Sequence, residues 1–229
     1  MRKVKLLAAA LALAIAAGGA QAKAPTSWDG LVQVKAKKLA LAYLRPDADF
    51  RAYSKVMFDP PEVAFEKNWQ RDFNRSTMSL AGRIDDADVR AAVDEAKKSV
   101  SKIFPERFTQ EGYQVANAPG PDVLRVSLGI LDLEVAAPDR SLPGRSRTYS
   151  VDAGEATFVV EVRDSLTNQL LGRALDRREA GEGPTFRRTY SSNIGDFEAL
   201  FDNWARISAR GLNELKAASP VNTDGIRKQ

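Results

Sequence analysis

Apolar side chains recur at helical spacing after Asp85 and predict a long amphipathic helix. Every third or fourth position is apolar, which places one hydrophobic stripe against a core. The stripe consists of Val89, Ala92, Val93, Ala96, Val100, Ile103 and Phe104. Asp85 and Asp86 suit the N-cap and the first turn, where the helix dipole favours acidic side chains. Pro105 is expected to interrupt the helix, and Gly112 to follow its end.

A second amphipathic helix is predicted from about Ile194 to Ala217. Its apolar stripe is rich in aromatic residues, which favours burial against a sheet. The stripe consists of Ile194, Phe197, Leu200, Phe201, Trp204, Ile207, Leu212 and Leu215. Gly211 lies inside this helix, where glycine costs about 1 kcal/mol relative to alanine. We therefore expect a neighbouring element to approach the helix closely at Gly211.

The strongest strand is predicted at Val123–Val135, where apolar and polar side chains alternate. The alternation changes parity beside Gly129, because the apolar positions are first Leu124, Val126, Leu128 and Ile130 and then Leu131, Leu133 and Val135. One extra residue in a strand re-aims every later side chain, so this pattern predicts a β-bulge. Asp132 and Glu134 alternate outward, which favours a solvated edge over a catalytic carboxylate pair.

A β-hairpin is predicted from two alternating segments, Thr157–Arg163 and Leu170–Arg177. The short polar segment Asp164–Gln169 joins them and supplies the turn. Two shorter strands are predicted earlier in the chain, at Leu39–Tyr43 and Tyr53–Phe58. The segment Val63–Trp69 stays undecided between strand and helix.

The order of these elements predicts a single α+β domain. We expect a mostly antiparallel or mixed sheet of about four to six strands, covered by the two long amphipathic helices. Neither an internal repeat nor an interdomain linker is visible in the sequence. The domain is expected to span residues 23–219, followed by a polar tail at residues 220–229.

The first 22 residues have the three parts of a cleaved secretory signal peptide. Three basic residues precede an apolar run, and Ala20 and Ala22 provide the small side chains that signal peptidase requires. The alternative is a membrane anchor, but the apolar run is too short to cross a bilayer. The mature chain is therefore predicted to be periplasmic. A lipoprotein would need a cysteine after the leader, and the sequence has none, although association with the outer membrane stays open.

Charge and composition narrow the possible chemistry further. The chain of 229 residues has 34 basic and 30 acidic side chains, and three of the basic ones lie in the leader, so the mature net charge is +1. This balance gives no support to nucleic acid as a partner. The chain contains neither His nor Cys. Disulfides, Cys-ligated metals and every His-based catalytic device are therefore excluded.

No catalytic or cofactor motif in the sequence predicts an enzyme. Ser99 and Lys102 have the spacing of a Ser-x-x-Lys motif, but they lie late in an amphipathic helix and lack its companion motifs. The glycine-rich phosphate-binding motifs are absent. Asp85, Asp86 and Asp88 are explained by helix capping rather than by a metal. We thus expect neither cofactor nor metal, and a pair of glycosidase carboxylates stays open.

Arginines are concentrated in two loops and at the end of the hairpin. These seven residues are Arg140, Arg145, Arg147, Arg177, Arg178, Arg187 and Arg188. If they converge, they form a surface for an anionic ligand or partner, because guanidinium groups suit carboxylates and phosphates. The favoured alternative is a solvated network in which these arginines pair with the acidic residues interleaved among them.

Several short segments together resemble the family called domain of unknown function 3313. They are Leu44–Phe50, Tyr53–Pro60, Pro119–Leu124, Gly144–Tyr149, Gly154–Thr157, Glu161–Ser165 and Asp176–Arg178. The resemblance covers nearly the whole mature chain and implies an exported envelope protein of Gram-negative bacteria. The family also includes predicted lipoproteins, from which this chain departs by lacking the lipid-bearing cysteine. The resemblance implies no enzymatic activity.

Three functional hypotheses follow. The leading one is a non-catalytic periplasmic module that binds an envelope protein or an anionic envelope component. The second is an oligomeric component of an envelope assembly or secretion machinery. The third is a carboxylate-dependent hydrolase of envelope glycans, which would need a cleft that holds two acids about 5 to 9 Å apart.

Overall fold

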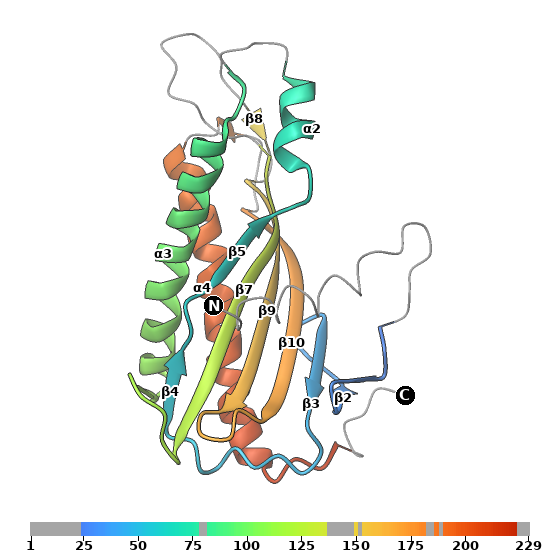
Figure 1. Ribbon diagram of the computed structural model, residues 1–229, viewed down its shortest axis with the longest axis vertical. Coiled ribbons are helices and arrows are strands. Elements are labelled where there is room, and N and C mark those ends of the chain that lie inside the picture. Colours follow the sequence, from blue (N-terminus) through green and yellow to red (C-terminus); the bar gives the residue numbers. More distant parts are fainter. Residues whose placement is uncertain are drawn as a thin grey trace.

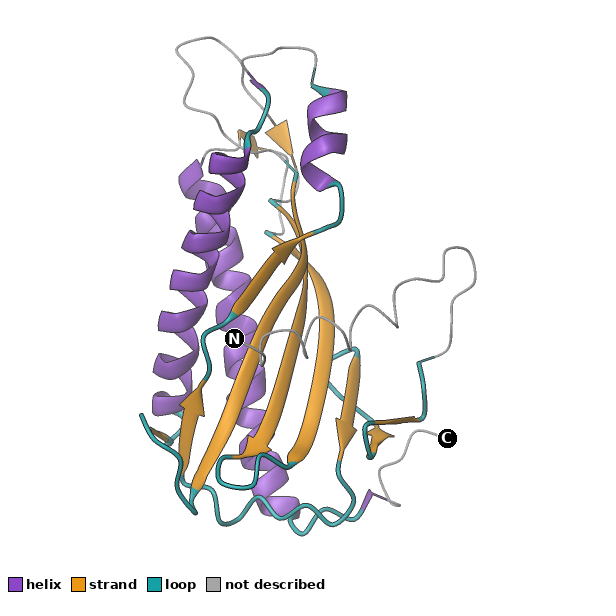
Figure 2. Ribbon diagram, viewed as in Figure 1, coloured by secondary structure: helices purple, strands orange, loops and turns teal. Residues whose placement is uncertain are grey.

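A long twisted sheet with two helices against one of its faces makes up most of the molecule (Figures 1 and 2). The computed structural model describes residues 24–77, 82–136, 149–150, 153–181, 186–187 and 190–223. The predicted leader lies outside these residues, and its cleavage stays a prediction. No helix in the described part of the chain is long and apolar enough to cross a membrane.

The described part of the chain forms one mixed sheet of nine strands and a separate two-stranded ribbon. The sheet contains β1 (Ser27–Trp28), β2 (Leu31–Val34), β3 (Leu41–Leu44), β4 (Lys55–Phe58), β5 (Glu62–Phe65), β6 (Gln114–Val115), β7 (Val123–Val135), β9 (Gly154–Asp164) and β10 (Leu170–Ala180), and the ribbon contains β8 (Tyr149–Ser150) and β11 (Phe186–Arg187). The expected α+β class and mixed sheet are confirmed. The expected four to six strands were too few, because strands of two to four residues carry too little alternation to be recognised.

The strand order is β1-β2-β3-β10-β9-β7-β4-β6, with β5 also paired to β7. From β1 to β7 in this order, each pair of adjacent strands is antiparallel. The predicted β9–β10 hairpin is confirmed. β4 and β5 both run parallel to β7 along the same edge, β4 beside its first half and β5 beside its second half. Asp59, Pro60 and Pro61 separate them.

The undecided segment Val63–Trp69 contains both kinds of structure. Strand β5 ends at Phe65, and the short helix α2 (Trp69–Ser76) begins at its last residue. Asn68 precedes the helix with a left-handed backbone, φ 71°. Asparagine tolerates this conformation better than most residues, which explains a sharp change from strand to helix within three residues.

The first predicted helix is α3 (Asp86–Gln110), and its N-terminus is capped as expected. The Asp85 carboxylate accepts hydrogen bonds from the backbone N–H groups of Ala87 and Asp88 at 2.8 and 3.0 Å, and the Asp88 carboxylate accepts one from the Asp85 N–H at 2.9 Å. The expected interruption at Pro105 was wrong. Proline costs one helical hydrogen bond there, but burial of Phe104 and Phe108 on either side outweighs this loss.

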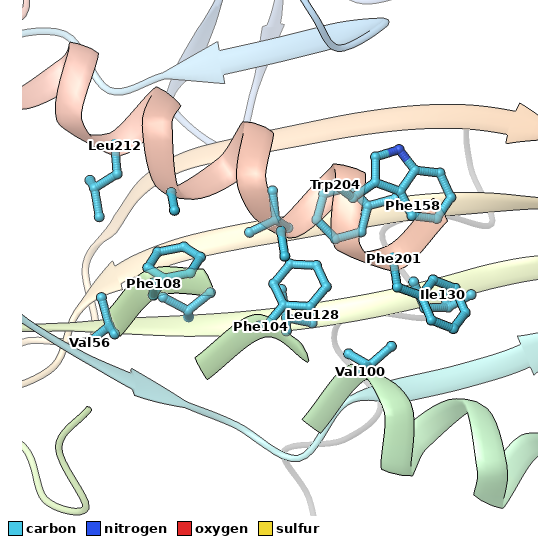
Figure 3. Packing of buried hydrophobic residues seen from close by; sticks show 14 of the residues in the cluster. Val56, Val100, Phe104, Phe108, Leu128, Ile130, Phe158, Phe201, Trp204 and Leu212 are labelled. Carbon is cyan, nitrogen blue, oxygen red and sulfur yellow. The ribbon is translucent and has the colours of Figure 1, made fainter. Parts of the chain in front are cut away.

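The second predicted helix is α4 (Tyr190–Ala218), which packs with α3 against the sheet. Figure 3 shows their large side chains meeting those of the central strands. Phe158 of β9 lies between the helices, with its ring centroid 5.5 Å from Phe104 and 5.1 Å from Trp204. The close neighbour expected at Gly211 was wrong, because a Cβ there would meet no atom within 4 Å beyond the helix's own backbone.

The predicted bulge in β7 is present, but it lies at Asp132 rather than beside Gly129. Asp132 has φ 47°, and the pairing of β7 with β9 shifts register between Leu131 and Glu134. Leu131 therefore packs on the face opposite the helices, whereas Leu133 returns to the main core. The bulge also leaves Glu134 on the face away from the helices.

Candidate functional site

An apolar cavity lies beside the N-terminal turns of α3 and α4. Both helices begin at the same end of the molecule (Figure 1). The volume of the cavity is about 210 Å³. Five elements (β5, α2, α3, β7 and α4) and the segment before α3 build its walls, mainly with Phe65, Trp69, Ile84, Val89, Ala92, Ala96, Leu133, Val135, Ile194, Phe197 and Phe201. Most of the polar groups in its wall are carboxylates. The arrangement resembles a ligand pocket, in which apolar walls surround a few polar groups.

The cavity exists because the inner face of α3 changes from large to small side chains. In the C-terminal half of the helix this face carries Val100, Phe104 and Phe108, which fill the space above the sheet. In the N-terminal half the corresponding positions are Ala92 and Ala96, which line the cavity. The predicted stripe contained both alanines, and their small size was the signal in the sequence that a space would lie beside them.

Trp69 forms the outer wall of the cavity and is held in place by two other rings. Its indole stacks on Phe65 with a centroid separation of 4.4 Å and on Phe73 at 5.8 Å. Trp69 and Val135 also line a second, polar hollow of about 490 Å³ beside α2. Trp69 therefore lies between an apolar cavity and a polar hollow.

Three carboxylates belong to the cavity wall: Asp88 and Glu95 on α3, and Glu198 on α4. The Ser99 hydroxyl donates a hydrogen bond to Glu198 Oε1 at 2.8 Å, which links the two helices beside the cavity. Lys98 Nζ lies 3.4 Å from Glu95 Oε1, but its side chain is highly exposed. Among the described residues, no lysine or arginine lines the cavity.

The polar hollow is acidic. Glu66, Asp72, Glu134, Glu155 and Glu179 all line it. Burial raises the pKa of Glu134 to about 7, and a hydrogen bond with Glu66 and the negative charges of Glu66 and Glu155 act in the same direction. This cluster was not predictable from the sequence, because its members come from segments far apart in the chain.

Arg177 pairs with two members of this acidic cluster, and Arg71 and Arg75 pair with Asp72. The Arg177 guanidinium pairs with Glu155 and, at 3.4 Å, with Glu134. The hydrogen bond from Arg177 lowers the pKa of Glu155 below its ordinary value. Asp132, which was considered with Glu134 as a carboxylate pair, instead accepts a hydrogen bond from the Thr157 hydroxyl at 3.2 Å.

Arg178 lies on the opposite face of β10 from Arg177, as expected for adjacent residues in a strand. It donates hydrogen bonds to Asp176 at 2.5 Å and to the Lys38 carbonyl at 2.6 Å. Both described members of the predicted arginine surface therefore pair within the protein and do not share a face. Four members, Arg140, Arg145, Arg147 and Arg188, lie outside the described residues, and so does the side chain of Arg187. Their convergence stays a prediction.

Comparison with known proteins identifies a family but no activity. A family model described as "Protein of unknown function (DUF3313)" matches residues 21–207. No curated protein matches the chain.

Several solved structures are similar in part. A PelC dodecamer from Paraburkholderia phytofirmans is 12% identical, with coverage of 72% of this chain and 95% of that chain and a TM-score of 0.36. A DUF330 protein from Xanthomonas campestris is 13% identical, with coverage of 76% and 91% and a TM-score of 0.40. A DUF4136 protein from Bacteroides thetaiotaomicron is 12% identical, with coverage of 80% and 98% and a TM-score of 0.37.

Proposed function

We propose that this chain, which belongs to the DUF3313 family of proteins of unknown function, is a non-catalytic binding module of the cell envelope. Its binding site is the apolar cavity between β5, α2, α3, β7 and α4. The predicted leader at residues 1–22 supports export to the periplasm. Fractionation of expressing cells tests this location: the protein should be released with the periplasm, and its N-terminus should be Lys23.

The observation that carries the proposal is the space left beside Ala92 and Ala96. Protein interiors are normally close-packed, and apolar cavities of about 150 Å³ bind molecules as large as benzene. The cavity of about 210 Å³ is therefore large enough for a small apolar group. Phe65, Leu133, Val135, Phe197 and Phe201 belong to the main core or pack against it, so these walls of the site are preformed.

Binding of a neutral apolar fluorophore, N-phenyl-naphthylamine, to the mature protein tests the proposal. Its emission should rise on binding, and the Ala96→Leu variant should lose this response because the added side chain fills the cavity. Ala217→Leu makes the same substitution on an exposed part of α4 and should leave the response unchanged. An equal response from wild type and a folded Ala96→Leu variant would rule out this cavity as the site.

The acidic hollow favours a second candidate function, hydrolysis of envelope glycans. A carboxyl whose pKa is raised to about 7 is suited to act as a general acid. However, both Glu66 and Glu155 hydrogen-bond directly to Glu134, whereas paired glycosidase carboxyls lie about 5 to 9 Å apart. Incubation with purified cell-wall glycan tests this candidate: release of reducing ends that is lost in Glu134→Gln would establish it over the non-catalytic proposal.

A further inference from the structure

We infer that the ligand of the apolar cavity is a small cationic amphiphile, with a hydrocarbon body inside the cavity and a protonated amine beside its carboxylates. This inference rests on the proposed function and adds the chemical class of the ligand. It follows from the charges that the described residues place in the cavity wall.

The carboxylates lie where the headgroup of a bound amphiphile would lie. Glu95 and Glu198 belong to different helices but line the same cavity, whose walls are otherwise mainly apolar. The Ser99 hydroxyl is committed to Glu198, which fixes that carboxylate beside the cavity. A cation placed there gains attraction from both glutamates in surroundings that are less polar than bulk water.

The same charges disfavour other headgroups. An anionic headgroup would be repelled by Glu95 and Glu198. Lys98 pairs with Glu95, but its side chain is highly exposed, and no described lysine or arginine lines the cavity. A neutral headgroup would gain the apolar contacts alone. The acidic hollow on the other side of Trp69 is lined by five carboxylates, which outnumber the described arginines paired with them, so it adds negative charge close by. The electrostatics therefore select for positive charge.

Three probes with the same hydrocarbon chain separate the contribution of the apolar contacts from that of the headgroup charge. They are octylammonium, octanol and octyl sulfate. Titration calorimetry on the mature protein measures their dissociation constants, below the micelle concentrations of the two ionic probes and below the solubility limit of octanol. We expect octylammonium to bind about tenfold more tightly than octanol and octyl sulfate about tenfold more weakly. Added salt should reduce the advantage of octylammonium, because the carboxylates are partly exposed.

Substitution of the two glutamates tests their role directly. The Glu95→Gln/Glu198→Gln variant should bind octylammonium no more tightly than octanol, while octanol binding stays at the wild-type level. Glutamine keeps an acceptor for the Ser99 hydroxyl, and Glu95→Gln alone provides a milder variant if the double variant is poorly folded. Glu106→Gln/Glu214→Gln makes the same change at exposed positions of the same helices and should have no effect.

The outcomes distinguish this inference from the function on which it rests. Binding of octanol and octylammonium with equal affinity would overturn the inference and leave the cavity as a binding site. Tightest binding of octyl sulfate would also overturn it. Failure of all three probes to bind folded protein would overturn both proposals.

Discussion

The indole nitrogen of Trp204 donates a hydrogen bond to the carboxylate of Asp176 over 2.9 Å, and both residues are buried. This contact ties helix α4 to strand β10. Asp176 also accepts a hydrogen bond from the Ala40 backbone N–H at 3.0 Å, so one side chain joins three segments. We expect Asp176→Ala to lower the free energy of unfolding by about 3 kcal/mol, because it leaves buried donors without partners.

Asp176→Asn keeps one acceptor oxygen and should cost about 1 kcal/mol. Urea denaturation followed by circular dichroism measures both effects. If Asp176→Ala were as stable as the wild type, the carboxylate would not hold the three segments together.

Arg173 forms a buried ion pair, and substitution of this arginine should lower the free energy of unfolding strongly. It donates a hydrogen bond to Glu161 at 2.7 Å, and the two side chains are only 3% and 4% exposed. Its guanidinium also lies 4.0 Å from the centre of the Trp28 ring. Arg173→Met should lower the free energy of unfolding by about 3 kcal/mol, because Glu161 loses a partner in a buried position.

A matched comparison is available at the same arginine. Asp29 pairs with Arg173 at 2.9 Å but is 53% exposed, so Asp29→Asn should cost less than about 1 kcal/mol. Thermal unfolding of both variants measures the difference. Equal losses would show that burial does not govern the strength of these pairs.

The raised pKa of Glu134 predicts a specific dependence of stability on pH. The folded protein favours the protonated carboxyl, so this contribution is full below the ordinary pKa of 4.5 and is lost as the pH rises through about 7. Glu134→Gln removes the dependence. From about pH 5 to pH 8, its free energy of unfolding should therefore rise by about 1 kcal/mol relative to wild type, since solvent screens a carboxyl that is 33% exposed.

The control for this measurement is Glu214→Gln, on the exposed face of α4. Its stability should follow that of the wild type across the same pH range. A Glu134→Gln variant that also follows the wild type would contradict the assignment of the pH dependence to the acidic hollow.

Two glycines should respond to alanine in opposite directions. Gly211 lies inside α4 with open space around it, so Gly211→Ala should stabilise the protein by about 1 kcal/mol. Gly154 has φ +136°, and a Cβ there would lie 1.9 Å from the Glu134 carbonyl oxygen. Gly154→Ala should lower the free energy of unfolding by about 3 kcal/mol or more. Differential scanning calorimetry of the two variants tests the contrast in one experiment.

Long periodic patterns were sufficient to predict the two main helices and the hairpin. The α3 cap was also predictable, because Asp85 begins a local motif that needs no tertiary contact. The family resemblance is confirmed as well. Short strands such as β1 and β6 were not predictable, since two residues carry no period and pair through their backbone. The bulge was predicted beside Gly129 and lies at Asp132, because the register between strands decides which residue is extra.

The candidate site was the least predictable part of the molecule. Its alanines were assigned correctly to the inner stripe of α3, but a stripe does not reveal whether its neighbours reach far enough to fill the space. Glu66, Glu134 and Glu155 meet only because β5, β7 and β9 lie side by side. The oligomeric alternative stays a prediction, which sizing of the purified mature protein tests.

The interrupted edge of the sheet has a consequence for how this protein behaves next to other chains. An unbroken edge strand offers a row of N–H and C=O groups on which a foreign strand can add. Here β6 already covers the start of β4, Pro60 and Pro61 fall between β4 and β5, and proline has no N–H to donate. An incoming strand would find no continuous ladder along this edge. The edge is thus poorly suited to seed intermolecular β-aggregation.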